Sequence, residues 1–201
     1  MILNELTLNE LLIWSALGYF IGSIPSGLLL TRLAGSGDIR KIGSGNIGTT
    51  NVLRTGHKGL AALTLAADIS TAFIVVFLAQ HFSTPTIALC SGAAVFIGHV
   101  LPVWLGFKGG KGVAVYIGVL LALHPLLALI FGIIWGVMAV LYRMSSLSAL
   151  TACLLIPFAI YYLADNGGWF ILSLVLSIFT FATHRANIKR LLRGEEPKIG
   201  Q

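Results

Sequence analysis

Seven long apolar runs dominate the sequence and leave few folds open to it. They occupy residues 11–33, 58–80, 86–105, 112–124, 126–142, 147–163 and 168–184. A helix needs about 20 apolar residues to cross the hydrocarbon core of a bilayer, and only helices or closed barrels satisfy their backbone there. These runs are too long and too continuously apolar for barrel strands. The sequence therefore predicts an all-α integral membrane protein with seven transmembrane helices.

The fourth run is unusual because, at about 1.5 Å per residue, it cannot cross a core of about 30 Å alone. Three arrangements are open to it: it merges with flanking residues, it tilts, or it begins inside the membrane. Pro125, directly after His124, favours a break between the fourth and fifth runs. Pro25, near the inner end of the first run, predicts a kink there.

Composition agrees with a membrane protein and argues against other classes. The chain is 57% hydrophobic and 10% charged, whereas soluble domains carry about 25% charged residues. Its basic residues occupy short gaps instead of a solvated face with aromatics, so we expect no nucleic-acid binding. Cys90 and Cys153 stand alone in apolar runs, which favours core packing over a disulfide or metal site. Because no long linker interrupts the chain, we expect residues 1–201 to form one domain.

The 13 basic residues all fall on one side of the predicted topology. They are Arg32, Arg40, Lys41, Arg54, Lys58, Lys108, Lys111, Arg143, Arg185, Lys189, Arg190, Arg193 and Lys198. The opposite side holds Glu5, Glu10, His81, His124 and Asp165. Since Lys and Arg are enriched in cytoplasmic loops, we expect the N-terminus outside and the C-terminus in the cytoplasm.

The segment 106–115, GFKGGKGVAV, places two lysines among four glycines at the start of an apolar helix. Glycines let the backbone approach a ligand closely, and free N–H groups at a helix start attract anions. We therefore expect Lys108, Gly109, Gly110, Lys111 and Gly112 to bind phosphate at a membrane surface. The alternative is a tight polar turn whose lysines only set topology. If the segment binds phosphate, Lys111→Ala should cost far more activity than Lys108→Ala.

The first loop, residues 35–59, is rich in short hydrogen-bonding side chains between glycines. Ser44, Asn46, Thr50 and Asn51 suit a phosphorylated or polyhydroxylated ligand, and Arg54 can grip phosphate as a fork. The alternative is a Ser/Thr/Asn-rich turn with helix caps.

Three further segments bring polar groups to the same side. Ser146 follows the fifth run, while His184 and Asn187, three residues apart, share a helix face at the end of the last run. Ser23, in the first run, is a candidate to line the site. For His99 in the third run, packing against a neighbouring helix is the default expectation.

Acidic side chains are scarce near these motifs. Asp38 is the only cytoplasmic acid close to them, and the nearby Arg40 is a natural partner for it. Without a carboxylate cluster or a GxSxG motif, we expect neither a metal site nor a serine triad. Asp68 lies about ten residues into the second run, where a charge is costly, so it is either protonated or paired.

Taken together, five motifs resemble the acyl-phosphate-dependent glycerol-3-phosphate acyltransferases of bacterial membranes. They are GSIPSG, GSGNIGTTNVLR, GHVLPVWLGFKGGKGVA, YRMSSLS and HRANI, in order from Gly22 to Asn187. The resemblance implies a multi-pass protein of the bacterial plasma (inner) membrane. It also implies acyl transfer from acyl phosphate to the 1-hydroxyl of glycerol 3-phosphate at the cytoplasmic face, giving lysophosphatidate for phospholipid synthesis.

The resemblance also assigns roles to residues. By motif position, the family's functional residues fall on Ser44, Asn46, Thr50, Asn51, Arg54, Lys111 with its glycine backbone, Ser146, His184 and Asn187. Two positions depart from the family pattern. Family members often have Thr where this chain has Val115. Many have Lys where this chain has Thr71, which removes the obvious partner of Asp68.

The expected chemistry needs no cofactor, because an acyl phosphate is already activated. Arg54, Lys108, Lys111 and the glycine N–H groups would offset the repulsion between two phosphate groups. The leaving phosphate takes the hydroxyl proton, with Ser146, His184 and Asn187 positioning the glycerol; His184 as general base is the competing hypothesis.

Two other function classes stay open: a carrier or channel for organic phosphate, and an acyltransferase that uses an acyl thioester. We expect a monomer in contact with membrane lipid.

Overall fold

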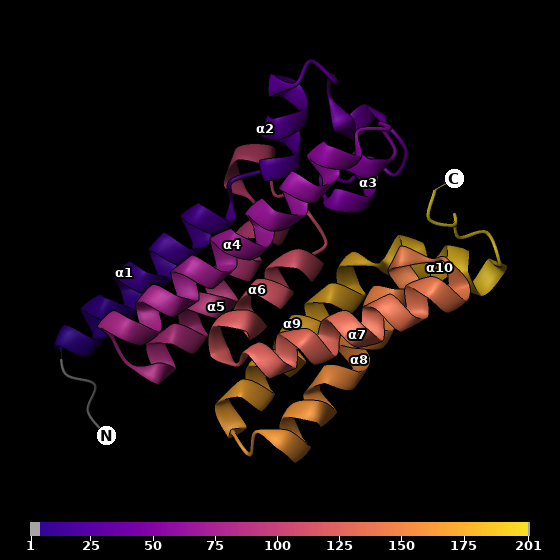
Figure 1. The fold of residues 1–201 in the computed structure, drawn as a ribbon. Helices are drawn as coiled ribbons and strands as arrows, with labels where there is room; N and C mark the ends of the chain where they lie inside the picture. Colours follow the sequence, from indigo (N-terminus) through magenta and orange to yellow (C-terminus); the bar gives the residue numbers. More distant parts are fainter. Residues whose placement is uncertain (1–4, 201) are drawn as a thin grey trace.

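The computed structural model describes residues 5–200, and over them it is helical with no strand (Figure 1). Met1–Asn4 and Gln201 lie outside the described residues. The elements are α1 (Glu5–Gly22), α2 (Ser26–Leu33), η1 (Ile39–Lys41), α3 (Thr49–Leu53), α4 (Lys58–Phe82), α5 (Pro85–Val100), η2 (Val103–Leu105), α6 (Val113–Leu123), α7 (Pro125–Tyr142), α8 (Ser145–Leu163), α9 (Gly167–Thr183) and α10 (Arg185–Arg193). The all-α prediction is confirmed for these residues.

Five helices in the described residues are long and apolar enough to cross a membrane. They are Thr7–Leu33, which joins α1 and α2, then α4, Pro85–Leu105, α7 and α8. A sixth is possible if α9 and α10, bent by 63° at their junction, form one span. The fourth predicted run becomes α6, whose 11 residues cover only about 16 Å. It begins behind the glycine-rich segment, and at that length it cannot cross a bilayer core alone.

Prolines divide the helices where the sequence indicates. The predicted kink at Pro25 is a break between α1 and α2, and Pro125 opens α7 directly after His124. Ser23 lies in the first of these breaks, where its hydroxyl donates to the Tyr19 carbonyl at 2.7 Å. The expectation that Ser23 lines the site is wrong, because the side chain is buried against its own helix.

The core lies where the six helices α4 to α9 meet, around the fully buried ring of Tyr116. Its hydroxyl donates to the Ser173 carbonyl at 2.8 Å, so the polar tip is satisfied inside the bundle. Close packing of α1 on α5 requires glycine, since a Cβ at Gly22 would meet the backbone of Val95. Cys153 is buried and unbridged in this core, as expected.

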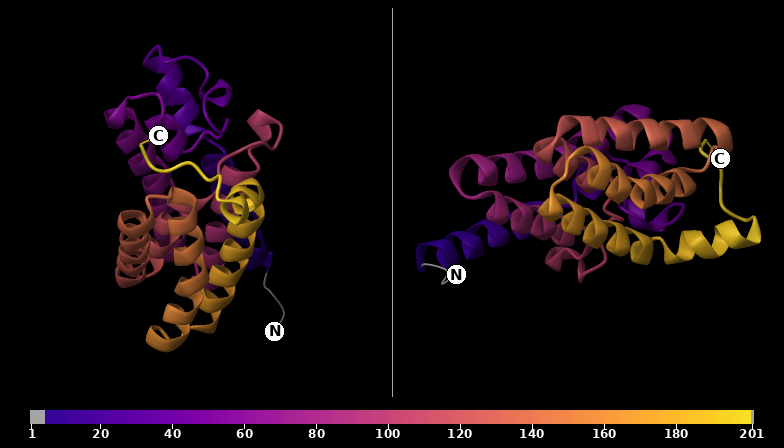
Figure 2. Two further views of the ribbon diagram at one scale, coloured as in Figure 1. Left: turned by 90° about the vertical axis from the view of Figure 1, so that its right-hand side faces the viewer. Right: turned by 90° about the horizontal axis from the view of Figure 1, so that it is seen from below.

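The connections are segregated between the two ends of the bundle. The turns after α4, α6 and α8 lie at one end, together with the start of α1 (Figures 1 and 2). The opposite end, which we call the loop end, carries α3, α10 and the junction of α7 with α8. The segments that the sequence analysis singled out therefore gather at the loop end.

Candidate active site

A cavity of about 890 Å³ opens at the loop end. Ten of the predicted site residues line it: Ser44, Asn46, Thr50, Asn51, Arg54, Lys111, Gly112, Ser146, His184 and Asn187. Three predicted phosphate-binding residues, Lys108, Gly109 and Gly110, are not part of the lining. Distant stretches of chain thus converge on one space, although not every predicted residue faces it.

The two glycine-rich segments touch each other at the cavity. The Asn46 amide donates to the Gly109 carbonyl at 3.4 Å, across 63 residues of sequence. On another side, the hydroxyls of Thr50 and Ser145 lie 3.0 Å apart, which ties α3 to the start of α8. The first loop is therefore fixed to two different parts of the bundle.

Asn51 organises the first loop from inside. Its amide nitrogen donates to the carbonyls of Ile39, Ile42 and Asn46 at 3.0, 3.0 and 2.8 Å. Its oxygen accepts the Ser44 N–H at 3.0 Å, and the side chain is only 2% exposed. Because these contacts occupy its polar atoms, Asn51 holds the loop in shape.

Arg54 is the cation that this loop presents to the cavity. Its nearest side-chain partner is the Asn51 oxygen, 3.5 Å from Nη1, which leaves the guanidinium available to an anion. The other arginine of the loop, Arg40, is committed to Asp38 through a 2.6 Å ion pair at the surface, as expected.

The glycine-rich segment uses its first N–H groups internally. The N–H groups of Gly109 and Gly110 donate to the carbonyls of Val100 and His99 at 3.1 and 3.0 Å, so neither is free for a ligand. Lys108 is exposed outside the cavity. The N–H groups that have no such internal acceptor therefore lie further along the chain, at the start of α6. There the N–H groups of the first turn have no partner within the helix and carry its positive dipole end.

Gly112 makes this helix start possible. Its φ of +88° lies in the left-handed region, and a Cβ there would collide with the Phe96 ring. Gly110 is constrained in a different way, because a Cβ would meet the imidazole of His99. His99 is thus packed against the glycine-rich segment and also lines the cavity, whereas the expected packing was against a neighbouring helix.

Lys111 joins the glycine-rich segment to α10. Its ammonium donates to Asn187 Oδ1 at 2.6 Å, and its carbonyl accepts the Thr183 hydroxyl at 3.1 Å. Burial lowers the pKa of Lys111 to about 8, although the nearby Glu196 carboxylate opposes this. Arg190 and Arg54 lower it further. Near pH 8, Lys111 is therefore about half protonated, and an anion that enters the cavity favours its charged form.

Glu196 is the main site residue that sequence reasoning missed. The expectation was that no carboxylate is positioned in the site, yet the chain after α10 returns and places Glu196 in the cavity, 8% exposed. Its carboxylate accepts from Ser146 Oγ, Asn187 Nδ2 and Arg190 Nε at 2.7, 2.6 and 2.7 Å. Burial raises the pKa of Glu196, but these three hydrogen bonds outweigh that effect and hold it below its ordinary value.

Glu196 fixes the orientation of its partners. Because it accepts the Asn187 amide N–H, the Asn187 oxygen must point the other way, to Lys111. It also binds the Ser146 hydroxyl proton, which leaves the oxygen lone pairs of Ser146 toward the cavity. The carboxylate, the amide and the ammonium form one chain of charge-assisted hydrogen bonds.

His184 sits at the bend between α9 and α10 and is 3% exposed. Its Nδ1 lies 2.8 Å from the Thr180 carbonyl. That contact requires a proton on Nδ1, so in the neutral ring Nε2 is the acceptor. Arg185, the next residue, is exposed and does not line the cavity.

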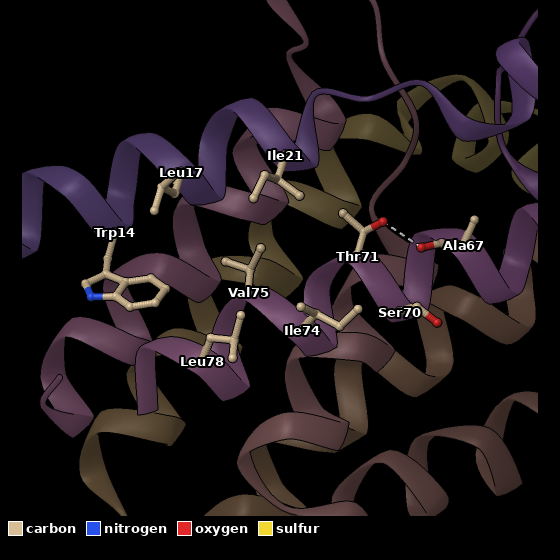
Figure 3. A pocket seen from close by; sticks show the side chains of 9 residues that line it. All are labelled: Trp14, Leu17, Ile21, Ala67, Ser70, Thr71, Ile74, Val75 and Leu78. Carbon is tan, nitrogen blue, oxygen red and sulfur yellow. Dashed lines mark hydrogen bonds between the residues drawn. The ribbon is translucent and has the colours of Figure 1, made fainter. Parts of the chain in front are cut away.

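Asp68 has a partner despite the missing lysine. The Ser26 hydroxyl donates to its carboxylate at 2.6 Å, and Asp68 lines the cavity near His99. Thr71 faces a different, apolar pocket between α1 and α4, where its hydroxyl donates to the Ala67 carbonyl at 2.7 Å (Figure 3). The hydroxyl at position 71 is therefore satisfied within its own helix.

Comparison with known proteins agrees with this geometry. The profile of the family described as glycerol-3-phosphate acyltransferase matches residues 12–194. A glycerol-3-phosphate acyltransferase of Mesorhizobium japonicum is 58% identical over 91% of this chain and 93% of its own length. Another, from Allorhizobium ampelinum, is 52% identical over 98% of this chain and 96% of its own length.

Two solved structures share the fold. A crystal structure of PlsY (YgiH), described as an integral membrane glycerol 3-phosphate acyltransferase in its glycerol 3-phosphate form, superposes with a TM-score of 0.90. It is 33% identical and covers 94% of this chain and 96% of its own. The lysophosphatidic acid form gives a TM-score of 0.88 at 32% identity, covering 94% and 95% of the two chains. This chain therefore belongs to the glycerol-3-phosphate acyltransferase family of integral membrane proteins.

Proposed function

We propose that this transferase moves an acyl group from acyl phosphate to the 1-hydroxyl of glycerol 3-phosphate, releasing lysophosphatidate and phosphate. In this proposal it acts as a single-domain monomer in the bacterial plasma membrane. Seven crossings, with the N-terminus outside and the loop end in the cytoplasm, account best for the confinement of all 13 basic residues to one side.

The observation that carries the proposal is the set of groups that one cavity brings together. Arg54, Lys111 and the start of α6 supply positive charge. Ser146, His184 and Asn187 supply neutral donors and acceptors beside them. Two phosphate groups held a few ångströms apart repel each other strongly at low dielectric, and this set of cations and N–H groups offsets that repulsion.

The reaction forms one bond and breaks one. The C1 hydroxyl oxygen of glycerol 3-phosphate attacks the acyl carbonyl carbon, and the bond from that carbon to the phosphate oxygen breaks. Free N–H groups at the start of α6 stabilise the oxyanion that develops on the carbonyl oxygen. Because the donor is already activated, the residues only position the reactants and balance their charge, and no cofactor is needed.

The hydroxyl proton goes to the leaving phosphate. Glu196 is a poor base, because three hydrogen bonds hold the pKa of its carboxylate below the ordinary value. His184 is the competing base, with Nε2 as the acceptor of its neutral ring. In this account His184 instead accepts a glycerol hydroxyl and orients it.

The two roles of His184 can be separated kinetically. If it only orients glycerol 3-phosphate, His184→Ala raises KM and leaves a substantial kcat. If it is the base, kcat falls by at least about a hundredfold with little change in KM. His184→Gln is the control, because its amide can still accept or donate a hydrogen bond but cannot act as a base near pH 7.

The donor is tested with purified protein in detergent and radiolabelled glycerol 3-phosphate. Hexadecanoyl phosphate and hexadecanoyl-coenzyme A are supplied separately. Formation of lysophosphatidate from acyl phosphate alone is the expected result, and formation from the thioester alone contradicts the proposal. In sealed proteoliposomes, accumulation of unacylated glycerol 3-phosphate would instead indicate a carrier.

A further inference from the structure

Beyond the phosphate-binding groups, the cavity continues between the helices as an apolar arm. We use this name for the part lined by Leu65 of α4, Ile117 of α6, and Gly132 and Trp135 of α7. Hydrocarbon and aromatic surface replaces the hydroxyls, amides and cations of the loop end. A ligand that fills the whole cavity must therefore be polar at one end and apolar at the other.

The apolar arm lies at the depth of the bilayer core and opens sideways. Gly132 is seven residues after Pro125 and eleven before Arg143, which places it about 10 and 16 Å from the two ends of α7. Gly132 and Leu65 line the cavity and yet are exposed, Leu65 by 38%. Helix α4 packs mainly against α6 and α7 mainly against α8, while α4 and α7 hardly touch each other, so the side of the arm between them faces lipid.

Gly132 and Trp135 share one face of α7, because residues three apart on a helix are neighbours. Trp135 is nearer to the loop end, and Gly132 is one turn deeper. A Cβ added at Gly132 would meet no atom within 4 Å. The glycine therefore leaves open space in the wall of the arm, directly beyond the indole.

We propose that the apolar arm binds the acyl chain of the donor and product, and that Gly132 and Trp135 determine which chains are accepted. Trp135 packs against the carbons that follow the carbonyl group. Gly132 provides the room through which the remaining carbons continue toward the lipid. The inference rests on the proposed acyl transfer, and adds where the chain lies and which residues select it.

The alternative is that the chain leaves the reaction centre directly into bulk lipid. In that case the side chain at position 132 would not touch it, and chain length would matter equally in every variant. Burying one more methylene changes an equilibrium about fourfold. If the acyl chain is confined to the arm, lengthening or shortening it by several carbons therefore changes kcat/KM strongly.

The test places a bulky side chain in the arm, with a matched control on the same helix. Gly132→Phe fills the space. Gly136→Phe is the control one turn away, because a Cβ at Gly136 also meets no atom within 4 Å but Gly136 does not line the cavity. The measurement is kcat/KM for acyl phosphates of 8 and 16 carbons. We expect the 16-to-8 ratio to fall by at least about tenfold in Gly132→Phe, and to match the wild type in Gly136→Phe.

An unchanged ratio in Gly132→Phe, or an equal fall in Gly136→Phe, overturns the inference. In Gly132→Ala and Gly132→Val the 16-to-8 ratio should fall by smaller amounts, in the order of side-chain size. These two variants replace Gly132→Phe if that variant does not fold. If the wild type uses only thioester donors, the proposed donor is wrong. The same ratio measured with thioesters of 8 and 16 carbons then still tests the arm.

Discussion

Lys111 joins two segments that line the cavity, because its ammonium donates to Asn187 while its backbone belongs to the glycine-rich segment. Glu196, in turn, orients Asn187 from the opposite side. The charge of one lysine and the charge of one glutamate thus set the geometry of the donors between them. The charge of each residue can be changed while the size of its side chain is kept.

The charge of Lys111 predicts a pH dependence of substrate binding. Burial lowers the pKa of Lys111 to about 8, so the side chain loses its proton as the pH rises through that value. Phosphate dianions bind the protonated form better, and KM for glycerol 3-phosphate should therefore rise above pH 8. In Lys111→Arg the charge persists, because the guanidinium pKa exceeds about 12. The measurement is KM against pH from 6.5 to about 9.5 for both proteins, and parallel profiles would refute this role.

Glu196 predicts a loss of activity and of stability when its charge is removed. Glu196→Gln keeps the size but weakens three hydrogen bonds to a charged acceptor, each with a typical contribution of about 1.5–3 kcal/mol. We expect kcat/KM to fall by at least about tenfold and Tm to decrease. The control is Glu195→Gln, because Glu195 is exposed and should tolerate the change.

The stability effect of Glu196 has a defined pH window. Its folded-state pKa lies below the ordinary value, so its contribution is complete above the unfolded-state pKa and is lost as pH falls through the folded-state pKa. The Tm difference between wild type and Glu196→Gln should therefore be largest near neutral pH and shrink in acid. A difference that grows as the pH falls would contradict the assignment.

Among the elements, α6 depends most on the chain that precedes it. It can begin inside the protein only because Gly112 adopts a left-handed conformation against Phe96. This start directs its free N–H groups into the cavity. A short apolar helix of 11 residues is therefore part of the proposed site.

Gly112 and Gly106 provide a comparison at the scale of this element. Both have a positive φ, but a Cβ at Gly106 meets no atom within 4 Å, whereas one at Gly112 collides with Phe96. Each Ala variant incurs a conformational cost of about 1–2 kcal/mol. Only Gly112→Ala adds the collision, so its activity and its Tm should both fall further than those of Gly106→Ala. The double variant Gly112→Ala/Phe96→Leu should recover part of the loss. Equal effects at the two glycines would exclude the collision.

Helix positions could be predicted from the sequence because hydrophobic length is a local property. The runs at 58–80 and 126–142 became α4 and α7 with ends within two residues. The separate helix α3 and the 63° bend at His184 were not predicted. Both depend on tertiary hydrogen bonds, such as those of Asn51 and Thr183, that no local pattern reveals.

The site could be predicted in outline but not in its pairings. The confinement of positive charge to one side was enough to predict that Arg54, Lys111 and Asn187 lie at the same end. Glu196 lies in a charged segment, RGEEPK, that reads as a solvated tail. Only the left-handed turn at Gly194, with φ +71°, returns the chain to the cavity. Likewise, the sequence predicts free N–H groups at Gly109 and Gly110, whereas in the structure two carbonyl groups of α5 accept them.

At the scale of the whole molecule, the proposed topology predicts which loops each face of the membrane exposes. In a background with Cys90 and Cys153 replaced by Ala, Lys108→Cys and Thr86→Cys place single thiols at exposed positions of opposite ends. A membrane-impermeant maleimide should label Thr86→Cys in intact spheroplasts and Lys108→Cys only in inverted vesicles. The reverse pattern would place the loop end outside the cell.

The central claim is that the cavity transfers an acyl group from acyl phosphate to glycerol 3-phosphate. The most direct test measures inorganic phosphate and lysophosphatidate in the same reaction, for the wild type, Lys111→Ala and Lys108→Ala. We predict equal molar amounts of the two products, lost together in Lys111→Ala and largely retained in Lys108→Ala, whose side chain lies outside the cavity. Phosphate released without lysophosphatidate, or lysophosphatidate formed without phosphate, would contradict the account.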